Sequence, residues 1–173
     1  MDNGKAVIEA LIFVSGSPLT VKRIAHVLEG MSEREIRETV QLLISEYEER
    51  RSGMRIVEVA GGYQLRTHQD VAEWIKKFTG LKPVSLSRAA LETLAVVAYR
   101  QPIMKSEIEK VRGVNVSGTL KGLLEKNMIR IVGRKDVPGR PIIYGTTKKF
   151  LEVFNLKDLS ELPTLRELKE LGE

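Results

Sequence analysis

Apolar side chains recur every three or four residues in three consecutive stretches of the middle of the chain, which predicts three helices. The first begins after Ser87, a residue type that caps helix N-termini, and runs to Arg100. The second is short, has Ile108 on its apolar face and ends at Gly113. The third begins near Asn115, and its apolar residues follow a spacing of i, i+4, i+7 and i+8: Val116, Leu120, Leu123 and Leu124.

Two runs with the character of strands follow these helices, at residues 129–133 and 141–145. The segment between them, residues 134–140, combines Pro138 and Gly139 with charged side chains, which is typical of an exposed turn. Three helices closed by a two-stranded hairpin make the winged-helix variant of the helix-turn-helix. We therefore predict a winged-helix domain in this part of the chain.

The N-terminal part of the chain predicts the same order of elements. Thr20 is placed to cap a second helix, and Ser32 with Glu35 has the pattern of a capping box for a third. Gly61 and Gly62 separate the two strands of a hairpin. The predicted elements are helices at residues 5–16, 21–28 and 32–51, a hairpin at residues 54–67 and a short helix at residues 69–78.

A shift of 84 residues aligns the two halves of the chain and indicates an internal repeat. The aligned pairs are Pro18 with Pro102, Leu19 with Ile103, and Ile24 with Ile108. The predicted fold class is therefore mainly α with small β hairpins (α+β), in two tandem winged-helix domains. The predicted segments are an N-terminal domain at residues 1–80, a linker at 81–86, a C-terminal domain at 87–150 and a leucine-rich, partly disordered acidic tail at 151–173.

Leucine occupies every third position of the tail from residue 156 to residue 171. A spacing of three drifts around a helix of 3.6 residues per turn, so it predicts no coiled coil. We expect two short turns instead, the second starting at a capping box of Thr164 and Glu167. The tail is expected to dock on the basic second domain or on a partner.

The composition excludes several classes of protein. The chain has no cysteine, so it has no disulfide framework and no thiolate chemistry. Its longest apolar runs are too short to span a bilayer, and the N-terminus lacks the pattern of a signal peptide. We therefore expect a soluble, intracellular protein with no membrane contact.

Charge is distributed unevenly along the chain. Residues 1–80 carry 11 Lys and Arg against 12 Asp and Glu, residues 81–149 carry 14 against 5, and residues 150–173 carry 3 against 6. A basic middle between two acidic ends indicates a nucleic-acid surface, an acidic protein partner, or a groove covered by the chain's own tail.

The sequence contains no signature of an enzyme. It has no nucleophile-elbow, P-loop or dinucleotide-binding motif. Its two histidines, His26 and His68, are not spaced as metal ligands, and we interpret His26 as a packing or surface residue. We predict no catalytic residue, no cofactor and no metal.

The first predicted helix is apolar on nearly every side, with Glu9 as its only polar residue between Ala6 and Val14. Such a helix must be covered on more than one side. Full burial inside a compact domain is one interpretation. The interpretation we favour is a homodimer interface, with the candidate residues Ile8, Ile12 and Phe13.

The third helix of the second domain has an outer face suited to a polypeptide. Its candidate contact residues are Gly118, Lys121 and Gly122. Reading bases requires long polar side chains, whereas two glycines four residues apart let another backbone approach closely. In the turn of the hairpin, three basic residues either contact phosphates or a partner, or are simply solvated: Arg134, Lys135 and Arg140.

Several long segments resemble the segregation and condensation protein B (ScpB) family. In the second half these are LETLAVVAYRQPI (residues 91–103), RGVNV (112–116), GRKDVPGRP (133–141) and YGTT (144–147). In the first half they are EALIFVSGSPL (residues 9–19) and GGYQLR (61–66). The resemblance covers about residues 5–165. The sequence departs from the family at Met104, where a capping Ser or Thr is more usual, so we expect a frayed helix start there.

The resemblance implies a non-enzymatic accessory subunit of the bacterial SMC complex, which organises and segregates chromosomes. It implies a homodimer formed by the N-terminal domains. It also implies that the C-terminal domains bind the kleisin subunit ScpA, which bridges the SMC ATPase heads. The implied location is cytoplasmic and nucleoid-associated, with DNA contact that is indirect or weak and non-specific. The alternative function is a winged-helix transcription regulator that reads an operator.

Overall fold

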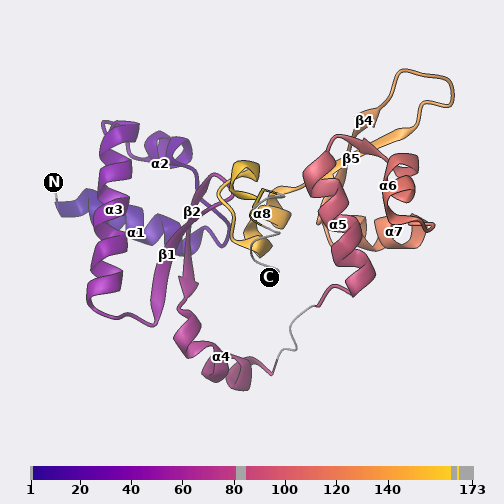
Figure 1. Cartoon of the computed structure of the whole chain (residues 1–173). Coiled ribbons are helices and arrows are strands. Elements are labelled where there is room, and N and C mark those ends of the chain that lie inside the picture. Colours follow the sequence, from indigo (N-terminus) through magenta and orange to yellow (C-terminus); the bar gives the residue numbers. More distant parts are fainter. Residues whose placement is uncertain (1, 81–84, 165–166, 168–173) are drawn as a thin grey trace. The chain divides into compact units, whose positions relative to one another are not determined.

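The computed structural model describes residues 2–80, 85–164 and 167, in two compact units (Figure 1). Unit 1 consists of Met1–Lys82 together with Asn155–Glu173, and unit 2 consists of Pro83–Phe154. The chain therefore leaves unit 1, forms unit 2 and returns to unit 1. Most of the predicted linker lies outside the described residues.

Three helices and a hairpin build the main part of unit 1, in the predicted order. They are α1 (Asp2–Val14), α2 (Val21–Val27), α3 (Glu33–Glu49), β1 (Met54–Val59) and β2 (Gly62–Thr67). β1 and β2 pair antiparallel, with Met54 opposite Thr67. A short 3-10 helix, η1 (Gln69–Val71), then leads into α4 (Ala72–Thr79).

The helices of unit 1 begin at the capping residues that the sequence indicates. The hydroxyl of Thr20 accepts a hydrogen bond from the Arg23 N–H at 3.3 Å, and that of Ser32 accepts one from the Glu35 N–H at 3.3 Å. Glu35 accepts a hydrogen bond from the Ser32 N–H at 2.8 Å, which completes the predicted capping box. Hydrogen bonds from the Ser32 side chain and backbone lower the pKa of Glu35.

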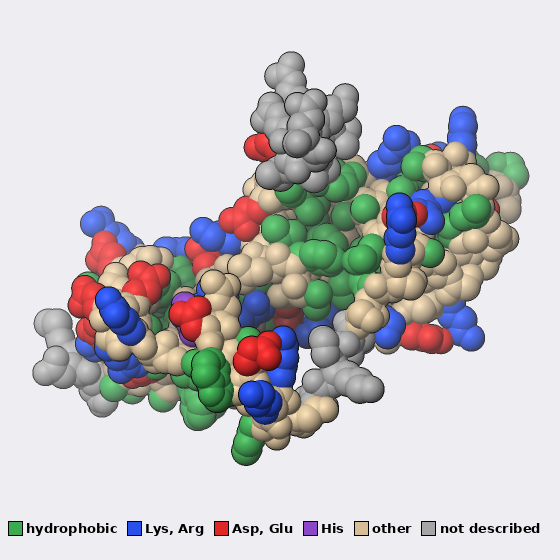
Figure 2. Space-filling model, turned by 60° about the horizontal axis from the view of Figure 1, so that its bottom comes forward, with side chains coloured by type: hydrophobic (Ala, Val, Ile, Leu, Met, Phe, Trp, Pro, Cys, Tyr) green, Lys and Arg blue, Asp and Glu red, His purple; other side chains and the backbone are tan. Residues whose placement is uncertain are grey.

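No residue of α4 is buried, although the helix carries large apolar side chains. In Figure 1, α4 lies at the lower edge of unit 1, and Figure 2 brings that edge forward. Hydrophobic side chains project into solvent there, beside Lys, Arg, Asp and Glu side chains. The sequence predicted a short amphipathic helix in this place, and its apolar face has no cover within the part of the chain that the structure describes.

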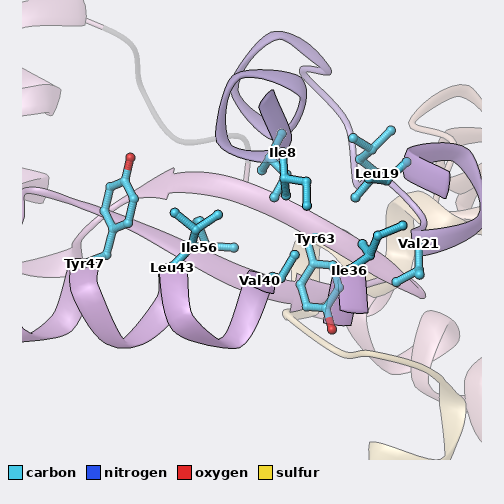
Figure 3. Packing of buried hydrophobic residues seen from close by; sticks show 11 residues of the cluster. Ile8, Leu19, Val21, Ile36, Val40, Leu43, Tyr47, Ile56 and Tyr63 are labelled. Atoms are coloured by element: carbon cyan, nitrogen blue, oxygen red, sulfur yellow. The ribbon is translucent and has the colours of Figure 1, made fainter. Parts of the chain in front are cut away.

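One cluster of apolar side chains from α1, α2, α3 and the hairpin forms the core of unit 1 (Figure 3). Ile8 and Ile12 belong to this cluster and are only 0% and 1% exposed, whereas Phe13 is 67% exposed. Because α1 turns Ile8 and Ile12 toward its own core, neither has surface left for a second chain. Of the three residues predicted for a dimer interface, only Phe13 remains exposed.

A backbone bridge joins the loop before α2 to the hairpin. The Leu19 N–H donates to the Tyr63 carbonyl at 2.8 Å, and the Tyr63 N–H donates to the Leu19 carbonyl at 2.9 Å. Gly62 lies directly against this bridge, since a Cβ at its position would be 2.8 Å from the carbonyl carbon and oxygen of Leu19. Only glycine allows the two backbones to come this close.

Unit 2 repeats the same plan. Its elements are α5 (Arg88–Arg100), β3 (Ile103–Met104), α6 (Lys105–Arg112), α7 (Ser117–Glu125), β4 (Ile129–Arg134), β5 (Ile142–Thr146) and α8 (Lys148–Phe154). The strands form an antiparallel sheet in the order β3-β5-β4, with Ile103 opposite Tyr144. The bridge between Leu19 and Tyr63 is the counterpart of this pairing in unit 1. The predicted α+β fold of two tandem winged helices, and the repeat that aligns Leu19 with Ile103, are confirmed.

Two details of unit 2 differ from the prediction. Met104 provides no side-chain cap at the start of α6, as the sequence indicates, but Glu107 accepts a hydrogen bond from the Met104 N–H at 2.8 Å. Helix α8 was not predicted. It begins after Thr147, whose hydroxyl accepts a hydrogen bond from the Phe150 N–H at 3.2 Å, and it buries the Phe150 ring 4.9 Å from that of Phe154.

Residues 155–158, which we call the strap, bind the β1–β2 hairpin of unit 1. The Ala60 N–H donates to the Leu156 carbonyl at 2.9 Å, and Lys157 Nζ lies 3.2 Å from Glu58 Oε2. This hydrogen-bonded carboxylate raises the pKa of Lys157. The tail, predicted at residues 151–173, was expected to dock on the second domain or on a partner. Its first four residues belong to unit 2 as part of α8, and the strap that follows belongs to unit 1.

The rest of the tail is described in part. A 3-10 helix, η2 (Leu159–Glu161), follows the strap. The hydrogen bonds of the capping box predicted at Thr164 and Glu167 are present, at 2.5 Å and 3.3 Å. The leucines predicted beyond this point, at positions 165, 168 and 171, lie outside the described residues.

Candidate functional site

The start of α5 and one face of α7 border a groove of about 370 Å³ in unit 2. Two of the three predicted contact residues, Gly118 and Gly122, line it. The full set of lining residues is Ser85, Leu86, Ser87, Ala90, Gly118, Thr119, Gly122, Leu123 and Lys126. The groove therefore has an apolar wall, several hydroxyl groups and one cation at its edge.

Packing among the described residues requires neither glycine of α7. A Cβ at Gly118 or at Gly122 would meet no described atom within 4 Å. Leu120 and Leu123 are buried and anchor α7 in the core, and Leu123 also forms the floor of the groove beside the two glycines. Each glycine makes a helix less stable than alanine would, by about 1 kcal/mol. The two glycines therefore leave the surface of α7 open at a cost in helix stability, and no packing contact among the described residues requires them.

Lys121, the third predicted contact residue, does not line the groove. Its side chain is exposed, and Nζ lies 3.9 Å from Glu125 Oε1 one turn further along α7. Exposed pairs of this kind contribute little to stability. The structure thus brings Gly118 and Gly122 together in one groove and leaves Lys121 on the neighbouring surface.

The three basic residues of the predicted turn lie together at the tip of the β4–β5 hairpin, which we call the wing (residues 134–141). Arg134 Nη1 donates to the Arg140 carbonyl at 3.1 Å, and the Lys135 N–H donates to the Pro141 carbonyl at 2.9 Å. All three side chains are exposed. No acidic side chain among the described residues forms an ion pair with any of them. Two hydrogen bonds therefore close the turn of the wing, and its three cationic side chains remain exposed and without an acidic partner among the described residues.

Three further exposed cations of unit 2 were not among the predicted site residues. Lys126, Arg130 and Lys148 are also exposed and flank the hairpin in the sequence. The signal that could have identified them is the charge count of the middle of the chain, 14 basic against 5 acidic residues.

A family model described as "Segregation and condensation complex subunit ScpB" matches residues 6–165. Segregation and condensation protein B of Syntrophotalea carbinolica is 46% identical over 167 residues, which cover 96% of this chain and 84% of the relative. The chain belongs to the ScpB family. The protein of the same name from Symbiobacterium thermophilum is 51% identical over 162 residues, covering 94% of this chain and 74% of that one.

Solved structures of ScpB are also similar to this chain. The crystal structure of ScpB from Mycobacterium tuberculosis shares 35% identity and covers 90% of this chain and 96% of its own, with a TM-score of 0.43. A dimer of the ScpB N-terminal domain complexed with ScpA peptide shares 33% identity and covers 44% of this chain and 95% of its own, with a TM-score of 0.42. The resemblance to ScpB inferred from sequence segments is confirmed by the family match.

Two of the segments that resemble ScpB lie at the candidate surfaces of this ScpB-family chain. Residues 112–116 end α6 and lead into α7, and residues 133–141 form the wing. The two histidines do not take part in either surface. His68 Nδ1 accepts a hydrogen bond from the Asp70 N–H at 3.3 Å, and no cluster of His, Asp and Glu among the described residues could hold a metal ion. None of the described helices could cross a membrane.

A network of ion pairs joins α5 to α6. Glu92 accepts hydrogen bonds from Arg112, at the end of α6, and from Arg88, whose Nε lies 3.0 Å away. These two guanidinium groups, Arg112 first, lower the pKa of Glu92. The network holds α6, and therefore the start of α7, against α5 in this ScpB-family chain.

We predict that Glu92→Gln lowers the melting temperature at pH 7 and that the difference from wild type closes in acid. Because the pKa of Glu92 is lowered in the folded state, its contribution is complete above the usual glutamate pKa of about 4.3 and is lost as the pH falls through the folded value. Thermal unfolding followed by circular dichroism from pH 7 to pH 2.5 measures this. As a control, Glu29→Gln changes an exposed glutamate without an ion pair among the described residues. If the difference in melting temperature between wild type and Glu92→Gln stayed constant with pH, the ionised Glu92 would not be the source of the stability.

Proposed function

We propose that this chain is a non-enzymatic adaptor of the SMC complex in chromosome condensation and segregation. It acts as a homodimer, formed by unit 1, that binds the kleisin subunit ScpA through unit 2. The observation that carries the proposal is the family match over residues 6–165, together with relatives of that name at 46% and 51% identity. Its function rests on binding surfaces, and no chemical step is assigned to it.

The groove over α7 supports a polypeptide as the partner. A segment of another chain can approach the backbone of α7 at Gly118 and Gly122 without meeting a side chain. An apolar side chain of that segment would contact Leu86, Ala90 and Leu123, which supply the apolar wall. The basic surface around the groove and wing favours a segment with acidic residues. This combination fits an amphipathic helix or an extended segment of the kleisin.

The experiment that tests the proposal mixes the full chain with overlapping ScpA fragments. Isothermal titration calorimetry and light scattering are expected to show a dimer that binds a ScpA fragment with one defined stoichiometry. Failure of the folded chain to bind any ScpA fragment, or a monomeric mass at high concentration, would contradict it. Tight binding to a single operator sequence instead would favour the alternative, a transcription regulator.

A second role follows from the uncompensated cations of the wing. We propose that Arg134, Lys135 and Arg140 contact DNA phosphates without reading the sequence. This contact is weak and strengthens the hold of an assembled complex on DNA. It requires no base-reading side chain on α7, where the exposed face presents glycine.

Reversing the three wing charges is predicted to reduce affinity for random-sequence duplex DNA at least about tenfold at low salt, because about three phosphate contacts are lost. The slope of log K against log salt should become shallower by roughly 2.7. Fluorescence anisotropy with R134E/K135E/R140E measures both. The matched control, K22E/R34E/R37E, reverses three exposed charges of unit 1 and should change neither. Equal losses in the two variants would show that net charge, and not the wing, determines binding.

A further inference from the structure

The apolar face of α4 is an exposed arm on unit 1. Trp74 and Phe78 lie one turn apart and are 67% and 90% exposed, and Ile75 beside them is 39% exposed. A helix of eight residues has little stability by itself and normally depends on packing of its apolar face. Two exposed aromatic side chains at this spacing therefore indicate a surface that is covered in the working protein.

Unit 1 also has a pocket next to the base of this arm. It has a volume of about 600 Å³ and lies between the C-terminal half of α3, β1 and the turn before α4. His68 and Asp70 line its rim, only a few residues before α4 begins. Apolar and aromatic side chains form one part of its lining: Ile44, Tyr47, Met54, Ile56 and Val57. Charged and polar side chains form the other part: Glu48, Arg51, Arg55, His68 and Asp70.

We propose that the arm of one copy inserts Trp74 and Phe78 into this pocket of a second copy, while the second copy's arm fills the pocket of the first. The inference rests on the proposed homodimer and assigns its interface. A two-fold dimer requires a self-complementary surface, in which each copy offers both halves of the contact. An arm and a pocket that adjoin on the same unit meet this requirement, because one two-fold axis can bring both pairs together.

The contact is large enough for a stable dimer. Aromatic side chains bury about 150–250 Å² each, so two of them bury about 400 Å² per copy. With two arms, and the equal area of pocket wall that each arm covers, the interface reaches about 1,600 Å², the usual size for a specific complex. Phe13 alone, the remaining exposed candidate on α1, would supply far less.

The pocket rim carries charges of both signs, the carboxylates of Glu48 and Asp70 and the guanidinium groups of Arg51 and Arg55. The arm carries Lys76 and Lys77 in its last turn, which can pair with the two carboxylates. Lys77 has no ion-pair partner among the described residues. Because the residues up to 80 are nearly balanced in charge, two copies of this unit can approach without strong repulsion.

Arg55 gives a second reason to expect an occupant. Its Nε is buried and has no hydrogen-bond partner among the described residues, and its side chain lines the pocket. A buried donor without a partner is unusual in a folded protein. With Arg51 beside it on the same rim, it offers guanidinium planes against which the ring of Trp74 can stack.

The test compares the oligomeric state of the full chain and of W74A/F78A by light scattering and sedimentation across a concentration series. The two aromatic residues are expected to act as hot spots, so the double variant should raise the dimer dissociation constant by at least about 100-fold. Neither residue is buried within unit 1, so the variant should retain the circular dichroism spectrum of the wild type. The matched control, F13A, removes an equally exposed aromatic ring from α1 and should leave the dimer intact.

Cysteine cross-linking tests the geometry directly, because the chain has no cysteine of its own. Glu48→Cys chains mixed with Lys77→Cys chains are expected to give a disulfide-linked dimer on a non-reducing gel, whereas each variant alone gives little. A dimeric wild type whose association survives W74A/F78A, or is lost in F13A instead, would overturn the arm-and-pocket contact and leave the proposed homodimer standing. A monomeric wild type would contradict both the arm-and-pocket contact and the proposed homodimer.

Discussion

Replacing Gly62 with alanine should lower the free energy of unfolding by about 3 kcal/mol, as expected for overpacking that the backbone cannot relieve. The new Cβ would lie 2.8 Å from the carbonyl carbon and oxygen of Leu19. Relief requires the β2 strand to move away from Leu19, which breaks the two hydrogen bonds between Leu19 and Tyr63. Both residues belong to the core cluster of unit 1, so the movement would also loosen that core.

Urea denaturation followed by circular dichroism measures the effect. The matched control is Gly118→Ala, because a Cβ there meets nothing within 4 Å and alanine favours a helix over glycine by about 1 kcal/mol. The control should therefore be as stable as wild type or slightly more stable. If Gly62→Ala unfolds at the same urea concentration as wild type, the bridge to Leu19 is not the close contact that the geometry describes.

The second large effect concerns binding and not stability. Gly122→Leu should weaken the binding of a ScpA fragment by about 100-fold, because the new side chain occupies the groove that we propose for the partner. The same change should leave the melting temperature unchanged or higher, since no described residue lies within 4 Å of the added Cβ. Loss of binding without loss of stability separates a binding surface from a packing position.

Two controls make this measurement specific. Gly122→Ala fills little of the groove and should weaken binding far less than Gly122→Leu. Ser106→Leu places the same side chain on an exposed position of α6 and should leave binding unaffected. Calorimetry with the same ScpA fragment gives all three values. Binding of wild-type strength by Gly122→Leu would move the partner site away from α7, toward the wing.

The elements with a strong local signal could be predicted from the sequence. The periodic helices, the capping box at Ser32 and the hairpin at Gly61–Gly62 are all fixed by neighbouring residues, so they need no tertiary information. The shift of 84 residues found the pairing that places Leu19 and Ile103 at equivalent positions of the two units. Gly118 and Gly122 were selected because their lack of side chains on an outward face is a property of the sequence itself.

Other features depend on tertiary packing that a sequence pattern does not contain. Composition indicates that α1 is apolar all round, but only its position in the core decides that Ile8 and Ile12 face inward and Phe13 outward. The groove, and the pocket beside α4, exist only once α5 and α7, or α3 and β1, have come together. Helix α8 has seven residues, too few for an apolar period to identify it, and Phe150 becomes buried only through tertiary packing.

The strap imposes an order on the maturation of the chain. The hydrogen bond from the Ala60 N–H to the Leu156 carbonyl cannot form during early synthesis, because Leu156 is translated only after all of unit 2. At about 5–20 residues per second, this delay is roughly 5–20 seconds. The first unit to emerge is thus the last to be completed, and a nascent chain that stops before residue 155 lacks both contacts of the strap with the hairpin.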